Sequence, residues 1–142
     1  SIVHIASHGQ FEGDVDDTFL LTYDDKMSMN ALEQFIGTTK FRDDAVELLT
    51  LSACQTAAGD DRAALGLAGV AVKAGARSAL ATLWTVNDPA SAALVSEFYN
   101  QLQDPTVSKA EALHRAQLLL SEDLRYWHPG YWSPFLLIGN WL

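Results

Sequence analysis

The sequence contains one cysteine, half as many basic as acidic side chains, and no long hydrophobic run. A single cysteine excludes an internal disulfide and favours a reducing compartment, for which the cytoplasm is the default. No apolar stretch approaches the roughly 18 residues that span a bilayer, and no signal peptide is visible. The formal net charge of −9 argues against a partner held through phosphate groups. We therefore expect a cytoplasmic protein without a membrane or nucleic-acid partner.

At 142 residues, of which 49% are hydrophobic, the chain has the size and composition of one compact domain. Apolar strand-like segments alternate with segments of helical periodicity. Crossovers of about a dozen residues or more connect parallel strands. The alternation therefore predicts an α/β fold with three layers, in which helices cover both faces of a mostly parallel sheet. The predicted strands are residues 2–7, 48–53, 77–84 and 131–139.

Local signals predict where the helices begin and end. Gly37 and Gly75 are expected to stop the first two helices, because glycine is favoured just past a helix. Asp88 is the expected N-cap of the third helix, with a proline in its first turn, and Ser108 opens a capping box for the fourth. The first helix, capped by Ser28 or Asn30, follows a short edge ribbon at 19–26 and has one apolar face, formed by Leu32, Phe35 and Ile36.

Only four principal strands are visible, although a three-layer domain of this kind usually has more. The chain also begins at Ser1, directly in a strand rather than at a methionine. We therefore expect the first strands to lie upstream of Ser1, so that residues 1–142 form the C-terminal part of a single domain.

Two of the predicted strands stop at residues that can carry chemistry. The first ends at His8-Gly9, and the second ends near Cys54, the only cysteine. Ligands of open α/β sheets bind at the carboxyl ends of the strands, so neighbouring strands would bring an imidazole beside a thiol. A histidine within hydrogen-bond reach activates a cysteine by taking its proton. The alternative to a catalytic role is that Cys54 is a buried, unreactive core residue.

The spacing and context of these residues resemble caspase-type cysteine peptidases, whose histidine lies about 50 residues before the cysteine. Here the separation is 46 residues, and Ala53, Cys54 and Gln55 fit the caspase signature, whereas Ser52 and Thr56 depart from it. The fuller resemblance is to CHAT domains, bacterial caspase-like modules related to separase and usually attached to tetratricopeptide repeats. The blocks that carry this resemblance are 4–9, 51–56, 74–78, 83–84, 110–113 and 131–135.

The resemblance implies a caspase-like fold in which His8 and Cys54 form a catalytic dyad. It also implies that the main-chain N–H groups of Gly9 and Cys54 form the oxyanion hole. In caspases the substrate pairs with the strand after the cysteine, which ends in Ser-Trp-Arg; here the similar place reads Leu83-Trp84-Thr85. Because the arginine is absent, we expect no preference for Asp before the scissile bond.

The acidic residues Asp88 and Asp60 could instead attract a Lys or Arg side chain of a substrate that lies along Trp84 and Thr85. Asp88 has an alternative explanation as a helix cap.

Metal binding is the weaker interpretation of the other titratable residues. His4, His8 and Cys54 could bind zinc, but no fourth ligand is evident. The acidic residues between 14 and 25 match no EF-hand spacing, so a solvated acidic loop is favoured over a calcium site. We expect no metal and no cofactor. The aromatic residues Trp127, Tyr131 and Trp132 are expected to close the end of the sheet, or to dock a repeat domain.

The sequence thus favours a cysteine endopeptidase that cleaves a protein or peptide substrate. The alternative is a catalytically idle caspase-like module that acts as an interaction or regulatory platform. A dinucleotide-binding domain is disfavoured, because no Gly-x-Gly-x-x-Gly motif follows the first strand. The resemblance further implies control by a partner or an attached tetratricopeptide-repeat region, and residues 10–27 and 55–62 are the candidate regulatory loops.

Overall fold

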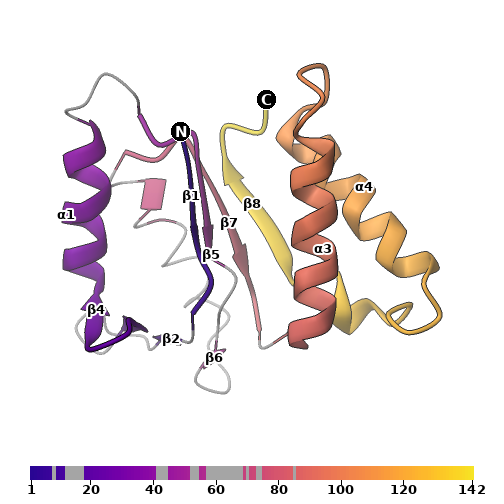
Figure 1. Ribbon diagram of the computed structural model, residues 1–142, viewed down its shortest axis with the longest axis horizontal. Helices are drawn as coiled ribbons and strands as arrows, with labels where there is room; N and C mark the ends of the chain where they lie inside the picture. Colours follow the sequence, from indigo (N-terminus) through magenta and orange to yellow (C-terminus); the bar gives the residue numbers. More distant parts are fainter. Residues whose placement is uncertain are drawn as a thin grey trace.

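The central feature of the fold is a four-stranded sheet, which runs through the middle of the molecule in Figure 1. In this computed structural model the strand order is β1 (Ile2–Ile5), β5 (Leu48–Leu51), β7 (Ser78–Thr82) and β8 (Phe135–Gly139). The first three strands are parallel, and β8 is antiparallel to β7. The structure describes residues 1–7, 9–11, 18–40, 45–51, 55–56, 69, 71–72, 75–84 and 86–142.

Helices cover both faces of this sheet, which confirms the predicted three layers (Figure 1). Helix α1 (Met29–Lys40) lies on one face, and helices α3 (Asp88–Gln101) and α4 (Lys109–Glu122) lie on the other. Successive side chains of a strand point to opposite faces, so β5 contributes Leu49 and Leu51 to the α1 side and Leu48 to the α3 side. Two apolar cores therefore sandwich the sheet.

A second, smaller sheet lies beyond the carboxyl ends of β1 and β5. Its order is β4 (Lys26–Ser28), β3 (Phe19–Leu21), β2 (Gly9–Phe11) and β6 (Gln55–Thr56). The antiparallel β3–β4 pair is the predicted edge ribbon, and its turn is closed by a 2.8 Å hydrogen bond from the Thr22 N–H to the Asp25 carbonyl. The sequence did not predict β2 or β6, because strands of two or three residues carry too little periodicity.

Helix α1 begins as expected, but its predicted end at Gly37 is wrong. The Ser28 hydroxyl accepts a hydrogen bond from the Ala31 N–H, so Ser28 rather than Asn30 is the cap. The helix then continues through Gly37 to Lys40. A glycine inside a helix costs only about 1 kcal/mol, and the burial of Leu32 and Ile36 offsets this. Phe35, from the same predicted face, is largely exposed.

The predicted stop at Gly75 is confirmed. Gly75 has a φ of +108°, and its N–H donates to the Val72 carbonyl at 3.0 Å, while the Ala76 N–H donates to the Ala71 carbonyl at 3.1 Å. These two bonds form a Schellman motif, which needs a left-handed residue at this position. Gly69, Ala71 and Val72, in the helix that was expected to stop here, are helical, and the other residues between 62 and 74 lie outside the described residues.

The capping serine of α4 is also confirmed. The Ser108 hydroxyl accepts a hydrogen bond from the Glu111 N–H at 3.2 Å, and the Glu111 carboxylate pairs with Arg115 one turn later. The buried face includes Leu113, Ala116 and Leu120, as the periodicity predicts. None of the described helices combines the length and the hydropathy that would let it cross a bilayer.

Candidate active site

The register of the central sheet aligns the ends of the two strands that precede the predicted dyad positions. β1 and β5 are adjacent and parallel, and Ile5 is the partner of Leu51 at their carboxyl ends. His8 and Cys54 each come three residues after these partners. His8 and Cys54 themselves, like Asp60 and Thr85, lie outside the described residues.

A second parallel pairing follows the dyad positions. β2 pairs with β6, so that Gln10 is the partner of Gln55 and Phe11 is the partner of Thr56. His8 directly precedes β2 and Cys54 directly precedes β6. The described parts of the chain before and after His8 therefore pair in parallel with those before and after Cys54.

The two pairings differ by one residue in register. Between them lie four residues on the histidine-bearing segment, 6–9, and three on the cysteine-bearing segment, 52–54. The chain thus passes from one sheet to the other with one more residue on the histidine side.

Gly9, the predicted second oxyanion donor, is the first residue of β2 and is buried. It is paired with Leu20 of β3 on one side. The strand β2 ends at Phe11, and residues 12–17 lie outside the described residues. The oxyanion role of Gly9 remains a prediction.

Trp84 lies just beyond the carboxyl end of β7, the neighbour of β5. Pairing with the last strand continues past β7, since the Leu83 N–H donates to the Pro134 carbonyl at 2.9 Å. The Trp84 side chain is 42% exposed, and its indole N–H donates to the Gly130 carbonyl at 3.4 Å. An aromatic ring therefore lies at the carboxyl end of the sheet, which is the end where we expect Cys54.

Asp88 is not the N-cap of α3, so that prediction is wrong. The cap is Asn87, whose side-chain oxygen accepts a hydrogen bond from the Ala90 N–H at 3.2 Å. Ala90 lies three residues after Asn87, at a position whose N–H an N-cap side chain reaches. The exposed Asp88 carboxylate instead lies in the first turn of α3, where the helix dipole favours a negative charge.

His4 belongs to a polar group on the α3 side of the sheet that the sequence did not reveal. His4 is the register partner of Thr50, and its ring centroid lies 5.6 Å from that of Tyr99 in α3. The Tyr99 hydroxyl donates to the Thr50 hydroxyl at 2.9 Å. Burial lowers the pKa of His4 and raises the pKa of Tyr99, although the hydrogen bond to Thr50 opposes the latter shift.

Among the described residues, no group of three or more His, Cys, Asp or Glu side chains is placed to hold a metal ion. Most members of the two metal sites considered from the sequence lie outside those residues: His8 and Cys54 for zinc, and Asp14, Asp16 and Asp17 for calcium.

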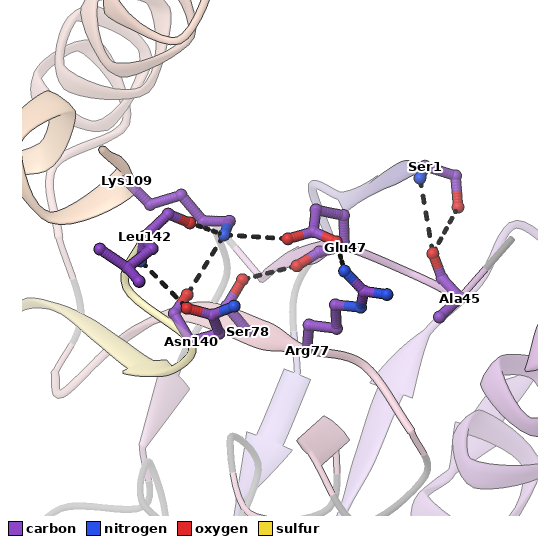
Figure 2. Close-up of polar contacts among 8 residues, drawn as sticks. All are labelled: Ser1, Ala45, Glu47, Arg77, Ser78, Lys109, Asn140 and Leu142. Carbon is purple, nitrogen blue, oxygen red and sulfur yellow. Dashed lines mark hydrogen bonds and ion pairs between the residues drawn. The ribbon is translucent and has the colours of Figure 1, made fainter. Parts of the chain in front are cut away.

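The opposite, amino end of the central sheet holds a charged cluster, which Figure 2 shows. Lys109, at the start of α4, is only 7% exposed, and its ammonium group contacts the Glu47 carboxylate at 3.0 Å. The same ammonium donates to the carbonyls of Asn140 and Leu142, and Arg77 contacts the other Glu47 oxygen at 3.1 Å. The hydrogen bond from Lys109, together with the charges of Lys109 and Arg77, lowers the pKa of Glu47.

Comparison with known proteins places this arrangement in a family. No curated protein matches the chain. The family model described as CHAT domain matches residues 1–140, which is nearly the whole sequence. This match confirms the resemblance drawn from the sequence motifs, and the three-layer fold is compatible with a caspase-like architecture. The chain therefore belongs to the CHAT domain family, whose members are caspase-like, peptidase-related modules.

Proposed function

We propose that this chain is a cysteine endopeptidase that uses His8 and Cys54 to hydrolyse peptide bonds in a protein substrate. The observation that supports the dyad most directly is the pair of parallel pairings around it, Ile5 with Leu51 before and Gln10 with Gln55 after. Strands in a sheet lie about 4.8 Å apart, which is within the reach of two side chains that form a hydrogen bond. Membership of the CHAT family supports the same assignment.

In the proposed reaction, His8 takes the proton of the Cys54 thiol and the thiolate attacks the carbonyl carbon of the scissile peptide bond. The N–H groups of Gly9 and Cys54 stabilise the oxyanion that forms. The imidazolium returns its proton to the leaving amine, and an acyl-enzyme remains. Water then attacks this thioester, again with His8 as the base, and releases the acid product and the free thiol.

The second sheet offers a place for control of this activity. Residues 10–27, a candidate regulatory loop from the sequence, include the strand β3 together with parts of β2 and β4. Sheet pairing links β4 through β3 to β2, which directly follows His8. We propose that a partner, such as an attached tetratricopeptide-repeat region, acts on this sheet and thereby on the dyad.

The test is the rate at which iodoacetamide labels Cys54 between about pH 5 and 9, in the wild type and in His8→Ala. An activated dyad gives rapid labelling well below the pH of about 8.5 at which a free thiol ionises, and His8→Ala moves the profile up to that value. His4→Ala is the matched control, because His4 lies in the same segment four residues earlier and is assigned no role in the reaction.

Labelling with the profile of an ordinary thiol in both the wild type and His8→Ala would contradict the proposal. The chain would then be the catalytically idle caspase-like module, which acts by binding a partner. An equal shift in His4→Ala and His8→Ala would also contradict it, because the effect would then come from the strand and not from the dyad.

A further inference from the structure

Ser7, the residue directly before the proposed catalytic histidine, makes a side-chain contact with the second sheet. Its hydroxyl donates a hydrogen bond to the backbone carbonyl of Leu21 in β3, 14 residues later in the chain. Ser7 itself belongs to the connection between the two sheets, after β1 ends at Ile5 and before β2 begins at Gly9. The contact therefore joins this connection to β3 through a side chain.

The residue directly after His8 is joined to the same strand. Gly9 is the register partner of Leu20, which directly precedes Leu21 in β3. The described neighbours of His8 on both sides thus contact adjacent residues of β3. Contacts on both sides of a residue restrict the conformations that the chain can adopt at that residue.

The strand β3 is a fixed anchor for these contacts. Leu20 is only 1% exposed and belongs to the apolar core on the α1 side of the central sheet. The same core contains Leu32 and Ile36 of α1, and also Leu51 of β5, the strand that leads to Cys54. Because β3 and β5 share one core, a bond to β3 relates the histidine-bearing segment to the cysteine-bearing segment.

We propose that Ser7 is a positioning residue for the reaction, and that its bond to Leu21 holds the chain so that the imidazole of His8 meets the Cys54 thiol. The inference rests on the proposed peptidase function. A general base acts only within about 3 Å of the group whose proton it takes, so a displacement of about 1 Å is costly. In this role Ser7 touches no reacting atom and acts only through His8.

A hydrogen bond of the same kind at the amino end of the central sheet provides the matched control. The Ser78 hydroxyl donates to the Glu47 carbonyl at 2.6 Å, and so joins β7 to the residue that precedes β5. Ser78→Ala therefore removes a serine donor from a neighbouring backbone carbonyl, as Ser7→Ala does, but at the opposite end of the sheet. We expect Ser78→Ala to change stability and to leave Cys54 unaffected.

The experiment measures the rate at which iodoacetamide labels Cys54 between about pH 5 and 9, because this reagent needs no substrate surface. The variants are Ser7→Ala, Ser7→Thr and Ser78→Ala. Ser7→Ala is also made in the His8→Ala background, which completes a double-mutant cycle. The free energy of unfolding of each variant is measured by urea denaturation.

Ser7→Ala is expected to slow labelling below the midpoint roughly tenfold, because a displaced imidazole stabilises the thiolate less well. The midpoint then moves up by about one pH unit, since the thiolate fraction below the thiol pKa falls tenfold per unit. Ser7→Thr should restore the wild-type profile, because threonine keeps the hydroxyl donor. In the His8→Ala background, Ser7→Ala should cause no further shift, since the residue that Ser7 positions is already absent.

Three results would overturn the inference. An unchanged profile in Ser7→Ala, with a loss of stability like that of Ser78→Ala, would show that the bond serves the fold alone. An equal shift with and without His8 would show that Ser7 does not act through the histidine. A folded Ser7→Thr variant with the profile of Ser7→Ala would show that the hydroxyl is not responsible.

Failure of the proposed function would give a different result. The wild type and His8→Ala would then share the profile of an ordinary thiol. If only the role of Ser7 is wrong, the difference between the wild type and His8→Ala stays intact.

Discussion

The two ends of the central sheet use their side chains in different ways. At the amino end, Glu47 joins the strand β5 to helix α4 through Lys109 and to β7 through Arg77, as Figure 2 shows. At the carboxyl end, β1 and β5 each continue into a second parallel pairing, between β2 and β6. The contacts at the amino end hold elements of the fold together, whereas the proposed catalytic residues follow the carboxyl ends of β1 and β5 in the sequence.

This difference shows that a cluster of charged residues is not by itself a functional site. Each group of the amino-end cluster has a structural partner: the Lys109 ammonium contacts Glu47 and two backbone carbonyls, and the Ser78 hydroxyl donates to the Glu47 carbonyl at 2.6 Å. We therefore expect substitutions at the amino end to change the stability of the fold and leave the reactivity of Cys54 intact. Substitutions at the dyad should do the opposite.

The largest effect is expected for Cys54→Ala. Removal of the nucleophile should lower the cleavage of a peptide library by at least about 10³-fold, because the thiolate forms the acyl-enzyme. The free energy of unfolding, measured by urea denaturation, should change by less than about 1 kcal/mol, since the substitution is small. Ser52→Ala, two residues earlier, is the matched control and should keep most of the activity. If a folded Cys54→Ala variant still cleaved the library, Cys54 would not be the nucleophile. The proposed contrast between a structural amino end and a catalytic carboxyl end would then be wrong.

The next largest effect is expected for Gly139→Ala, at the amino end. Gly139 has a φ of +97°, and an added Cβ atom would lie 2.4 Å from the carbonyl oxygen of Arg77 and 3.1 Å from Cα of Ser78. Backbone atoms of the neighbouring strand cannot move aside cheaply, so the variant should lose about 3 kcal/mol of stability.

Gly37→Ala is the control for this substitution. Gly37 lies inside α1, and an added Cβ atom there would meet no atom within 4 Å. Alanine at this position should stabilise the protein by about 0.5 to 1 kcal/mol, because glycine is unfavourable inside a helix. Similar stabilities of the two variants would contradict the argument from backbone conformation.

These positions also show how far the sequence could predict the molecule. The buried strand at 48–51, the stop at Gly75 and the cap at Ser108 follow from local signals, and each is confirmed. Two predicted helix ends are wrong: at Gly37 the packing of α1 outweighs the weak preference of glycine, and at Asp88 the neighbouring Asn87, also a favourable cap residue, takes the N-cap position. Secondary-structure signals are local, and such competition is decided by the surroundings.

The contacts between distant residues could not be predicted. Glu47 meets Lys109, Tyr99 meets Thr50, and Trp84 meets Gly130 across separations of 46 to 62 residues. No spacing rule connects residues so far apart, because their meeting depends on strand order and on how the helices pack. The dyad of His8 and Cys54 follows from the strand ends and from the family resemblance and stays a prediction; the structure confirms that the strands before these residues, β1 and β5, are parallel neighbours.

A smaller effect is expected for Lys109→Met. This substitution keeps the apolar part of the buried side chain but removes the ammonium group, which leaves Glu47 and two carbonyls without that donor. Loss of these charge-assisted hydrogen bonds should lower the free energy of unfolding by about 2 kcal/mol. The labelling rate of Cys54 should not change, since Lys109 lies at the other end of the sheet.

Arg77→Ala is the matched control, because Arg77 contacts the same carboxylate from a side chain that is 60% exposed. Solvent screens this pair, so the expected loss is at most about 0.5 kcal/mol. Equal losses in Lys109→Met and Arg77→Ala would mean that burial of the ammonium group is not what makes the first contact important.

The smallest effect, definite in sign, is the pH dependence that Glu47 gives to stability. Because the hydrogen bond from Lys109 and the nearby positive charges lower its pKa below 4.5 in the folded protein, Glu47 binds a proton more readily when the chain is unfolded. Its stabilising contribution is therefore complete above about pH 4.5 and declines as the pH falls through the folded pKa.

Glu47→Gln removes the charge and keeps a hydrogen-bond acceptor, so the stability difference between wild type and variant should narrow on acidification. Asp123, whose pKa Arg125 lowers to about 2, titrates in both proteins and cancels in this difference. A difference that stays constant or widens between about pH 6 and 3 would show that the Glu47 charge does not stabilise the amino end.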